Sequence, residues 1–524
     1  MTPPVSKEQY RLEQEAFVSN HGGTTPEEVI FTLLPSVCGV LLATTTLGIL
    51  KKYTHENVRV VIEFMLTVIP IILCCTILSG HIGSVCVIMI SMSLLNIMLL
   101  LNKRINLPNS TRVRPVTGKR PFVTHFRALT NIITAICILA VDFRIFPRKF
   151  AKTEAFGYSL MDTGVGLFIL ANALVAPEAR DFSTFRRGGF QETLTKNMKN
   201  CFRSCVPLLV LGFGRIAVVE YVGYQKHVTE YGVHWNFFIT LAIVKLFSSM
   251  IISSINSKYS LLSGIWILWM HEYTMSFKDL KTWVLAWDGP RDDFISANRE
   301  GLISVPGYVG LYFVGVAIGR LIHSTYQSSH TRSNMNFSLK LYGYEFGMGY
   351  THCNESMLLC IKLSLISAQT CITTLFCDFK ISRRLANAGY CMWIVILATI
   401  LLSLLLLIEL VLDVIDCAIN ESSIESKTEK LRKNLRLNLK KHGESEREEN
   451  DECVIRRSLE IFDGVNYNGL FFFLVSNVMT GLVNMSMHTL YTKQLVALLI
   501  LIIYMAVSIL STLILYRLKI PIKL

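Results

Sequence analysis

Apolar segments of roughly 20 residues recur along the whole chain and are separated by polar stretches. A helix needs about 20 apolar residues to cross the hydrocarbon core of a bilayer, where it satisfies its own backbone hydrogen bonds. Membrane β-barrels typically show segments of roughly ten residues in which apolar and polar positions alternate, and this sequence shows no such segments. The pattern therefore predicts an all-α, polytopic membrane helical bundle with about thirteen transmembrane helices. The segments lie at residues 29–50, 58–80, 82–101, 129–143, 157–176, 206–223, 235–255, 259–275, 303–322, 356–377, 388–415, 468–487 and 493–516.

Polar segments divide this pattern into four regions. A polar N-terminal segment covers residues 1–28, and the first eleven helices occupy 29–416, with a charge-rich connector within 140–168. A charged stretch at 417–467 follows, which we expect to be a cytosolic loop that is partly helical or disordered. The last two helices and a basic tail lie in 468–524. The N-terminal segment is too polar and acidic for a signal peptide, so we expect the first helix to target the chain to the membrane.

Composition changes this picture little. The 524 residues are 52% hydrophobic, and the formal net charge is +13. In a membrane protein a positive balance reflects basic cytosolic loops more often than nucleic-acid binding. The 14 cysteines are scattered and show no paired spacing typical of a metal site, so we expect small core residues rather than metal ligands and predict no metal site.

The positions of the basic loops predict an orientation. Loops after odd-numbered apolar segments are polar or basic, and positive charge is favoured on the cytosolic side, so the N-terminus lies outside the cytosol and the C-terminus inside it. Two loops on the opposite side, 144–156 and 378–387, are basic as well. Positive charge on that side indicates an anionic ligand, such as a phosphate group.

The connector after the fourth segment carries the strongest candidate chemistry. Asp142 directly follows an apolar run, and an ionisable group at mid-bilayer costs roughly 2.5–3.5 kcal/mol. Pro147 disfavours further helix, so we expect the helix to end near 143–146, with Lys152 on the connector beyond it. A partly desolvated carboxylate can act as a general base, and a nearby cation can stabilise an oxyanion or bind phosphate. The alternative is a local ion pair, or lysine and arginine side chains that reach lipid headgroups.

Other polar side chains lie where predicted helices begin or end, and we treat them as candidate substrate-binding residues. Each has a structural alternative: an acid such as Asp162 is favoured near a helix N-terminus, Trp235 is typical of an interfacial belt, and His234 is more often structural than a base. The candidates are Arg144, Arg148, Lys149, Asp162, His234, Trp235, Asn236, Asn298, Arg299, Arg383, Arg384, Asn387 and Asn477.

Several blocks of this sequence resemble the glycosylphosphatidylinositol (GPI) inositol acyltransferase family. They run from the N-terminal region to the last helix pair, whereas loops 102–120, 323–355 and 417–467 carry none. The blocks are AVDFRIFPRKFAKTE followed by MDTGVG, AFVSNHGGTT at 16–25, GYQKHVTEYGVHWNFF at 223–238, ANREG at 297–301, SRRLANAGYCMWI at 382–394 and SNVMTGLVN at 476–484.

The resemblance implies a multi-pass protein of the endoplasmic reticulum membrane, and the orientation predicted from the basic loops would place its N-terminus in the lumen. It implies transfer of a fatty acyl group, usually palmitoyl, from acyl-coenzyme A to the 2-hydroxyl of inositol in glucosaminyl-phosphatidylinositol. Acyl-coenzyme A is then a co-substrate, and no permanently bound cofactor, nucleic acid or obligate protein partner is expected. The family's catalytic aspartate and lysine correspond to Asp142 and Lys152. Asp142 would be the general base, and Lys152 would stabilise the oxyanion or hold a phosphate.

Other functions remain compatible with the same residues. A secondary transporter would line its path with polar side chains, and a membrane scaffold would need no chemistry at all. A third alternative keeps acyl transfer but makes His234 the base. The sequence contains no GxSxG, HExxH or P-loop motif, and no serine or cysteine lies beside an obvious base. An acyl transfer would therefore be direct, without an acyl-enzyme.

Overall fold

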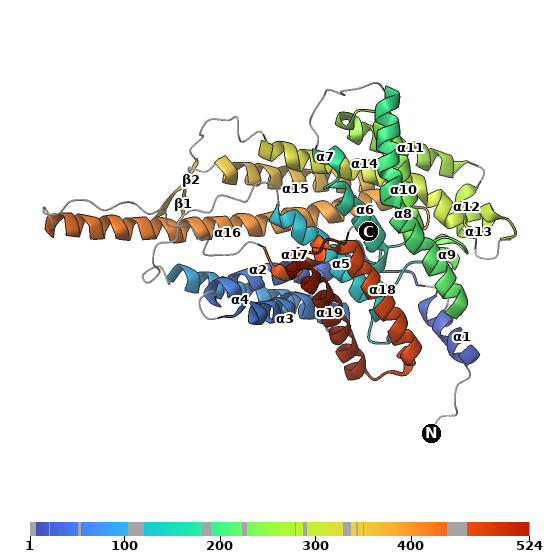
Figure 1. Ribbon diagram of the computed structural model, residues 1–524, viewed down its shortest axis with the longest axis horizontal. Coiled ribbons are helices and arrows are strands. Elements are labelled where there is room, and N and C mark those ends of the chain that lie inside the picture. The colour runs from blue at the N-terminus through green and yellow to red at the C-terminus, as the bar shows by residue number, and fades with distance from the viewer. Residues whose placement is uncertain are drawn as a thin grey trace.

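The computed structural model describes residues 7–19, 21–50, 54–102, 120–180, 190–222, 228–277, 279–286, 291–327, 337–341, 344–348, 351–437 and 458–522. These residues are overwhelmingly helical, and the helices form one bundle (Figure 1).

The first half of the chain supplies α1 to α10. Their bounds are α1 Lys7–Val18, α2 Pro26–Leu50, α3 Glu56–Cys75, α4 Ile82–Asn102, α5 Pro121–Ala140, the 3-10 helix η2 Arg148–Phe150, α6 Leu160–Ala173, α7 Pro177–Arg180, α8 Phe190–Val222, α9 Val228–Tyr231 and α10 Phe237–Ser254.

The second half supplies α11 to α19. Their bounds are η3 Ser257–Tyr259, α11 Ser260–Ser276, α12 Leu280–Leu285, α13 Phe294–Ala297, α14 Arg299–Gln327, β1 Phe337–Leu341, β2 Tyr344–Met348, α15 Thr351–Cys377, α16 Ala388–Leu437, α17 Glu460–Tyr467, α18 Gly469–Ser486, η5 Thr489–Tyr491 and α19 Gln494–Arg517.

The predicted all-α membrane bundle is confirmed. Every apolar segment predicted from the sequence overlaps one of these helices, and within the described ranges 10 helices are long and apolar enough to cross a membrane. The number of thirteen crossings stays a prediction. The apolar helix α6 has only 14 residues, which at 1.5 Å per residue is about 21 Å, less than the roughly 30 Å hydrocarbon core.

Three groups of helices surround a buried centre. α2 packs against α3 and α4, α8 packs against α10, and α15 runs along α16. Between them, α5 contacts α6, α16, α18 and α19, and its residues are buried along nearly their whole length. Because α5 lies at the centre, the chain that leaves its C-terminal end at Ala140 emerges inside the protein rather than at its surface.

The connector between α5 and α6 is held by two other loops. The Thr24 backbone N–H donates to the Tyr158 carbonyl at 2.7 Å, and the Gly157 N–H donates to the Ile381 carbonyl at 3.0 Å. The second bond joins the connector to loop 378–387. Loops 144–156 and 378–387, which are basic although they lie on the predicted non-cytosolic side, therefore lie against each other.

Helix α16 extends far beyond the bundle. α16 has 50 residues, and Figure 1 shows it projecting past the other helices. The predicted loop 417–467 thus begins as helix up to Leu437, while 438–457 lies outside the described residues. β1 and β2 form one antiparallel hairpin in which Leu339 is opposite Phe346.

A single glycine lets the α15–α16 loop lie directly on α14. A Cβ atom at Gly307 would lie 1.9 Å from the Ala386 carbonyl oxygen, a backbone atom that cannot move aside cheaply. Gly83 in α4, by contrast, has open space around it, because a Cβ atom there would have no neighbouring atom within 4 Å.

We expect Gly307→Ala to destabilise the protein, because the new methyl group must displace the loop. Overpacking of this kind costs roughly 1–3 kcal/mol, and the expected result is a lower Tm of the detergent-solubilised protein. Gly83→Ala is the matched control and should leave the Tm unchanged or slightly raised, since alanine is the better helix former. An unchanged Tm for Gly307→Ala would show that the loop does not pack as described.

Candidate active site

The end of α5 places Asp142 inside the bundle. The helix ends at Ala140, a few residues before the expected 143–146, and the chain continues in tight turns in which the Asp142 N–H donates to the Leu139 carbonyl at 3.2 Å. Pro147 lies beyond these turns and precedes η2. A proline disfavours helix at the residue before it, so it does not set the exact end of a helix several residues upstream.

Asp142 has the environment of a general base. Its side chain is only 8% exposed, and Asn484 of α18 donates from Nδ2 to its Oδ2 at 2.7 Å. Burial raises the pKa of Asp142 to about 6. The hydrogen bond from Asn484 and the positive charges of Arg148 and Lys152 act in the opposite direction. The carboxylate therefore titrates near neutrality while it is held in place by a neighbouring helix.

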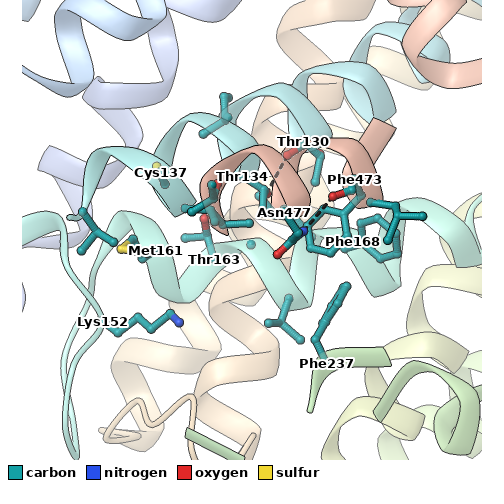
Figure 2. Close-up of a pocket in the computed structure, with 18 of the residues that line it drawn as sticks. Thr130, Thr134, Cys137, Lys152, Met161, Thr163, Phe168, Phe237, Phe473 and Asn477 are labelled. Atoms are coloured by element: carbon teal, nitrogen blue, oxygen red, sulfur yellow. Dashed lines mark hydrogen bonds between the residues drawn. The ribbon is translucent and has the colours of Figure 1, made fainter. Parts of the chain in front are cut away.

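Lys152 extends from the connector into the same cavity (Figure 2). Its ammonium group forms an ion pair with Glu230 of α9, and both side chains are partly buried. Asp142 and Lys152 line the same cavity, and the positive charge of Lys152 favours the carboxylate form of Asp142. Two carboxylates, Asp142 and Glu230, and the Lys152 ammonium thus line one cavity.

The cavity has a volume of about 770 Å³ and a mainly apolar wall. Helices α5, α6, α8, α10, α16 and α18 supply most of the wall. Figure 2 shows Lys152 at one side and the rings of Phe168, Phe237 and Phe473 at the other. The centroids of Phe168 and Phe237 are 5.3 Å apart, and those of Phe237 and Phe473 are 5.2 Å apart. Such a cavity suits a ligand with one charged and one apolar part.

The charged side chains that line the cavity form a defined set, which we call the charged group of the cavity. Its members influence one another electrostatically, directly or through Tyr231, so they lie in one region. The set consists of Asp142, Lys152, Arg215, Glu230 and Arg383.

A buried ion pair supports this region from behind. Arg383 donates from Nε to Asp162 Oδ1 at 2.7 Å, and both side chains are almost completely buried. The other carboxylate oxygen of Asp162 accepts the Thr153 N–H at 3.1 Å and its hydroxyl at 2.6 Å. Asp162 therefore ties α6 to the residue that follows Lys152, and through Arg383 to loop 378–387.

The other cations of the connector are directed elsewhere. Arg148 donates from Nη2 to the carbonyls of Val141 at 2.9 Å and Phe143 at 3.0 Å, so it closes the turns around Asp142. Burial lowers the pKa of Arg148 to about 10. Lys149 pairs with Glu28 at the start of α2. Arg144 is exposed, and its guanidinium carbon lies 6.0 Å from the ring centroid of Tyr491. Arg144, Arg148 and Lys149 therefore do not line the cavity.

Three candidates around loop 378–387 also hold backbone rather than face the cavity. Arg384 donates to the Glu154 carbonyl at 2.8 Å and to Glu300 Oε1 at 3.2 Å. Arg299 is fully buried and donates to the Ala286 carbonyl. Asn387 caps α16, because its Oδ1 accepts the Tyr390 N–H at 3.1 Å, and the same oxygen accepts the Ser382 N–H of the loop at 3.1 Å.

The candidates near α10 shape the loop that precedes that helix. The His234 backbone N–H donates to Asn298 Oδ1 at 2.8 Å, while the His234 side chain is exposed. Trp235 donates its indole N–H to Thr240 Oγ1 at 2.9 Å, and Asn236 caps α10 by accepting two backbone N–H groups. None of these four candidates lines the cavity.

The structure thus brings Asp142, Lys152, Arg383 and Asn477 to the cavity wall. It adds Arg215 and Glu230, which were not among the candidates. A charge within the apolar run LGFGRIAVVE is a signal for Arg215, because such charges pair or line a cavity. Glu230 lies in a polar stretch that precedes an apolar segment and within the block at 223–238, so the resemblance includes it, although its position alone does not distinguish it from the polar residues around it.

Comparison with known proteins gives the family. The family model described as GWT1 matches residues 10–515, which include every residue of the charged group. The chain belongs to the GWT1 family. It is 31% identical over 511 residues to "Glucosaminyl-phosphatidylinositol-acyltransferase PIGW" of Mus musculus, with 94% of this chain and 95% of that protein covered. The protein of the same name from Homo sapiens is 33% identical over 536 residues, covering 96% and 97%. "GPI-anchored wall transfer protein 1" of Candida albicans is 30% identical over 530 residues, covering 98% of each.

In this GWT1-family chain, the sequence blocks that carry the resemblance meet in space. The connector block contributes Asp142 and Lys152, the SRRLANAGYCMWI block contributes Arg383, and the SNVMTGLVN block contributes Asn477 and Asn484. Within the described ranges, no group of three or more His, Cys, Asp or Glu side chains is placed to hold a metal ion.

We expect Arg383→Leu to destabilise the protein strongly. Removing one partner leaves the buried Asp162 carboxylate uncompensated, which costs roughly 3–5 kcal/mol. Thermal unfolding in detergent measures the effect. Lys149→Ala breaks a partly exposed pair with Glu28 and should change stability by about 0–1 kcal/mol. Equal small effects of both substitutions would contradict the supporting role given to the Asp162–Arg383 pair.

Proposed function

We propose that this chain is an acyltransferase of GPI-anchor biosynthesis. It transfers a palmitoyl group from acyl-coenzyme A to the inositol 2-hydroxyl of glucosaminyl-phosphatidylinositol. The family and the names of its relatives support the reaction class. The observation that carries the proposal is buried Asp142, whose pKa is raised to about 6, near Lys152 in a mainly apolar cavity of about 770 Å³.

The residues of the cavity suggest a direct transfer. The Asp142 carboxylate removes the proton of the inositol hydroxyl, and the hydroxyl oxygen attacks the thioester carbonyl carbon. The Lys152 ammonium stabilises the negative charge that develops on the carbonyl oxygen. The carbon–sulfur bond then breaks, and the coenzyme A thiolate takes the proton from Asp142. An ester and free coenzyme A are formed, and Asp142 returns to its carboxylate form.

The apolar wall suits the acyl chain. Burial of a methylene group contributes about 0.8 kcal/mol, so a long chain gains most of its affinity from such a wall. The charged group of the cavity meets the headgroup and the reacting atoms, and the aromatic rings of Phe168, Phe237 and Phe473 meet the apolar tail. The acyl chain then orients the thioester toward Asp142.

The proposed location is the endoplasmic reticulum membrane, with the N-terminus in the lumen and the C-terminus in the cytosol. The contact between loops 144–156 and 378–387 agrees with the alternation of the apolar segments, which assigns both loops to the same side of the membrane. Carboxylates neutralise Lys149 and Arg383, and the Arg148 guanidinium donates to backbone carbonyls, so the positive charge of these loops does not require the cytosolic side.

Asp142→Asn should abolish acyl transfer, because the amide cannot accept the proton; general-base catalysis contributes roughly 10²–10⁴-fold. Lys152→Ala should lower kcat by roughly 10²–10³-fold if its charge meets the oxyanion. The measurement is acyl transfer in membranes supplied with palmitoyl-coenzyme A and glucosaminyl-phosphatidylinositol. Lys281→Ala, which breaks an ion pair with Glu272 outside the cavity, is the control.

Two outcomes would point to other functions. Retained activity in Asp142→Asn together with loss in His234→Ala would make His234 the base, whereas we expect His234→Ala to remain active because its side chain is exposed outside the cavity. Substrate flux in proteoliposomes without any need for acyl-coenzyme A would instead favour a transporter.

The pH dependence should follow Asp142. A general base acts in its deprotonated form, so kcat/KM should fall as the pH is lowered through about 6. Asn484→Leu removes a hydrogen bond that favours the carboxylate, so the acid limb should move to higher pH by about one unit. Asn477→Leu changes a cavity residue on the same helix without touching Asp142 and should leave that limb in place. An acid limb unaffected by Asn484→Leu would exclude Asp142 as the titrating group.

A further inference from the structure

Glu230 is the cavity residue for which the proposed reaction has no task. It lies on α9, the short helix before α10, and its partly buried carboxylate pairs with Lys152. Among the described residues that line the cavity, the carboxylates are Asp142 and Glu230. A second carboxylate beside the catalytic lysine lowers the net positive charge of a site that must receive an anionic lipid, so its presence calls for a reason.

The headgroup named for the relatives carries both signs of charge. A glucosaminyl group is an amino sugar, whose amine is protonated near neutral pH, and phosphatidylinositol contributes a phosphodiester. Ionised carboxylates only accept hydrogen bonds, and lysine and arginine only donate them. An ammonium group in this cavity can therefore form an ion pair only with Asp142 or Glu230. Asp142 has to receive the hydroxyl proton, which leaves Glu230 for the amine.

The cations of the charged group differ in whether they are already paired with a carboxylate. Arg383 is already paired with Asp162, and Lys152 with Glu230. Arg215 lines the cavity, its side chain is exposed, and in the described part of the chain it forms no ion pair. Arginine binds phosphate oxygens through two parallel N–H groups. Arg215 is thus the cation of the charged group that is best placed for the phosphodiester.

We propose that Glu230 binds the ammonium group of the amino sugar and so makes the site selective for an amino sugar over a neutral one. The proposal rests on the proposed function, because it assigns one part of that same lipid substrate. The ligand class is a glycosylated phosphoinositide with a primary amine on the sugar.

This assignment also connects substrate binding to Lys152. A carboxylate has about four lone-pair sites, so Glu230 can accept the amine and Lys152 together. When a second cation binds the Glu230 carboxylate, the attraction between Glu230 and Lys152 becomes weaker. The Lys152 ammonium has three N–H donors, so it can donate to another acceptor as well. The Lys152 ammonium then turns more readily to the thioester oxygen. The amine should therefore raise kcat as well as lower KM.

The test compares two lipids that differ only at the sugar, glucosaminyl-phosphatidylinositol and glucosyl-phosphatidylinositol, in which a hydroxyl replaces the amine. We expect the unmodified protein to prefer the amino lipid in kcat/KM by about tenfold or more, the range of a hydrogen bond to a charged group. In Glu230→Gln the preference should fall to about threefold or less. The substitution also releases Lys152 from its ion pair, but it does so equally for both lipids, so this release alone cannot create a preference in the variant.

Glu28→Gln is the matched control. Glu28 also pairs with a lysine of the connector, Lys149, but does not line the cavity. This variant should keep the full preference for the amino lipid. Glu230→Asp, which keeps a carboxylate on a shorter side chain, should restore part of it.

The possible failures can be told apart. A full preference in Glu230→Gln, with Asp142→Asn inactive, would overturn the role of Glu230 and leave the proposed acyl transfer standing. No acyl transfer to either lipid by the unmodified protein would overturn the proposed function. If Glu230→Gln shows no turnover, binding of the two lipids to this variant in nanodiscs decides. Retained preference for the amino lipid in binding overturns the proposal, and equal binding supports it.

Discussion

The buried ion pair between Asp162 and Arg383 is the interaction on which the candidate site depends. It joins three parts of the chain that are far apart in sequence: the start of α6, the connector beside Lys152 and the loop before α16. Two charges in a low-dielectric interior are stable only as a pair with good geometry and further hydrogen bonds, and Thr153 supplies these bonds to Asp162. The position of Lys152 in the cavity thus rests on a pair that itself lies mostly behind the cavity wall.

The connector shows how one short segment can contain both structural and chemical charges. The Arg148 guanidinium donates to carbonyl groups of the turns around Asp142, and Lys149 forms an ion pair with Glu28 of α2. Of the charged side chains of this segment, Asp142 and Lys152 line the cavity. This division between structural and cavity-lining charges follows from geometry. Because α5 ends in the interior, the side chains of the connector face either the backbone that they stabilise or the space that the helices leave open.

Much of the fold could be predicted from the sequence, since lipid-spanning helices are local features of about 20 apolar residues. Asp142 and Lys152 could also be singled out, because charge beside an apolar run is costly and therefore conspicuous. Their partners could not be found in this way. Asn484 lies 342 residues from Asp142, and Glu230 lies 78 residues from Lys152. Such pairings depend on how helices pack, and neither an asparagine within an apolar segment nor a glutamate in a polar stretch indicates which residue it will contact.

The shortness of α6 has a consequence for the competition between alcohol and water. A helix of about 21 Å leaves part of a bilayer's apolar depth to the connector, and non-helical backbone is stable at that depth only when protein covers it. Asp142 lies in that covered connector and is nearly inaccessible to solvent. A base that can activate a lipid hydroxyl can equally activate water, and an exposed site would waste the activated acyl group by hydrolysis. In the proposed reaction, the depth set by a truncated helix favours transfer to a lipid over loss to water.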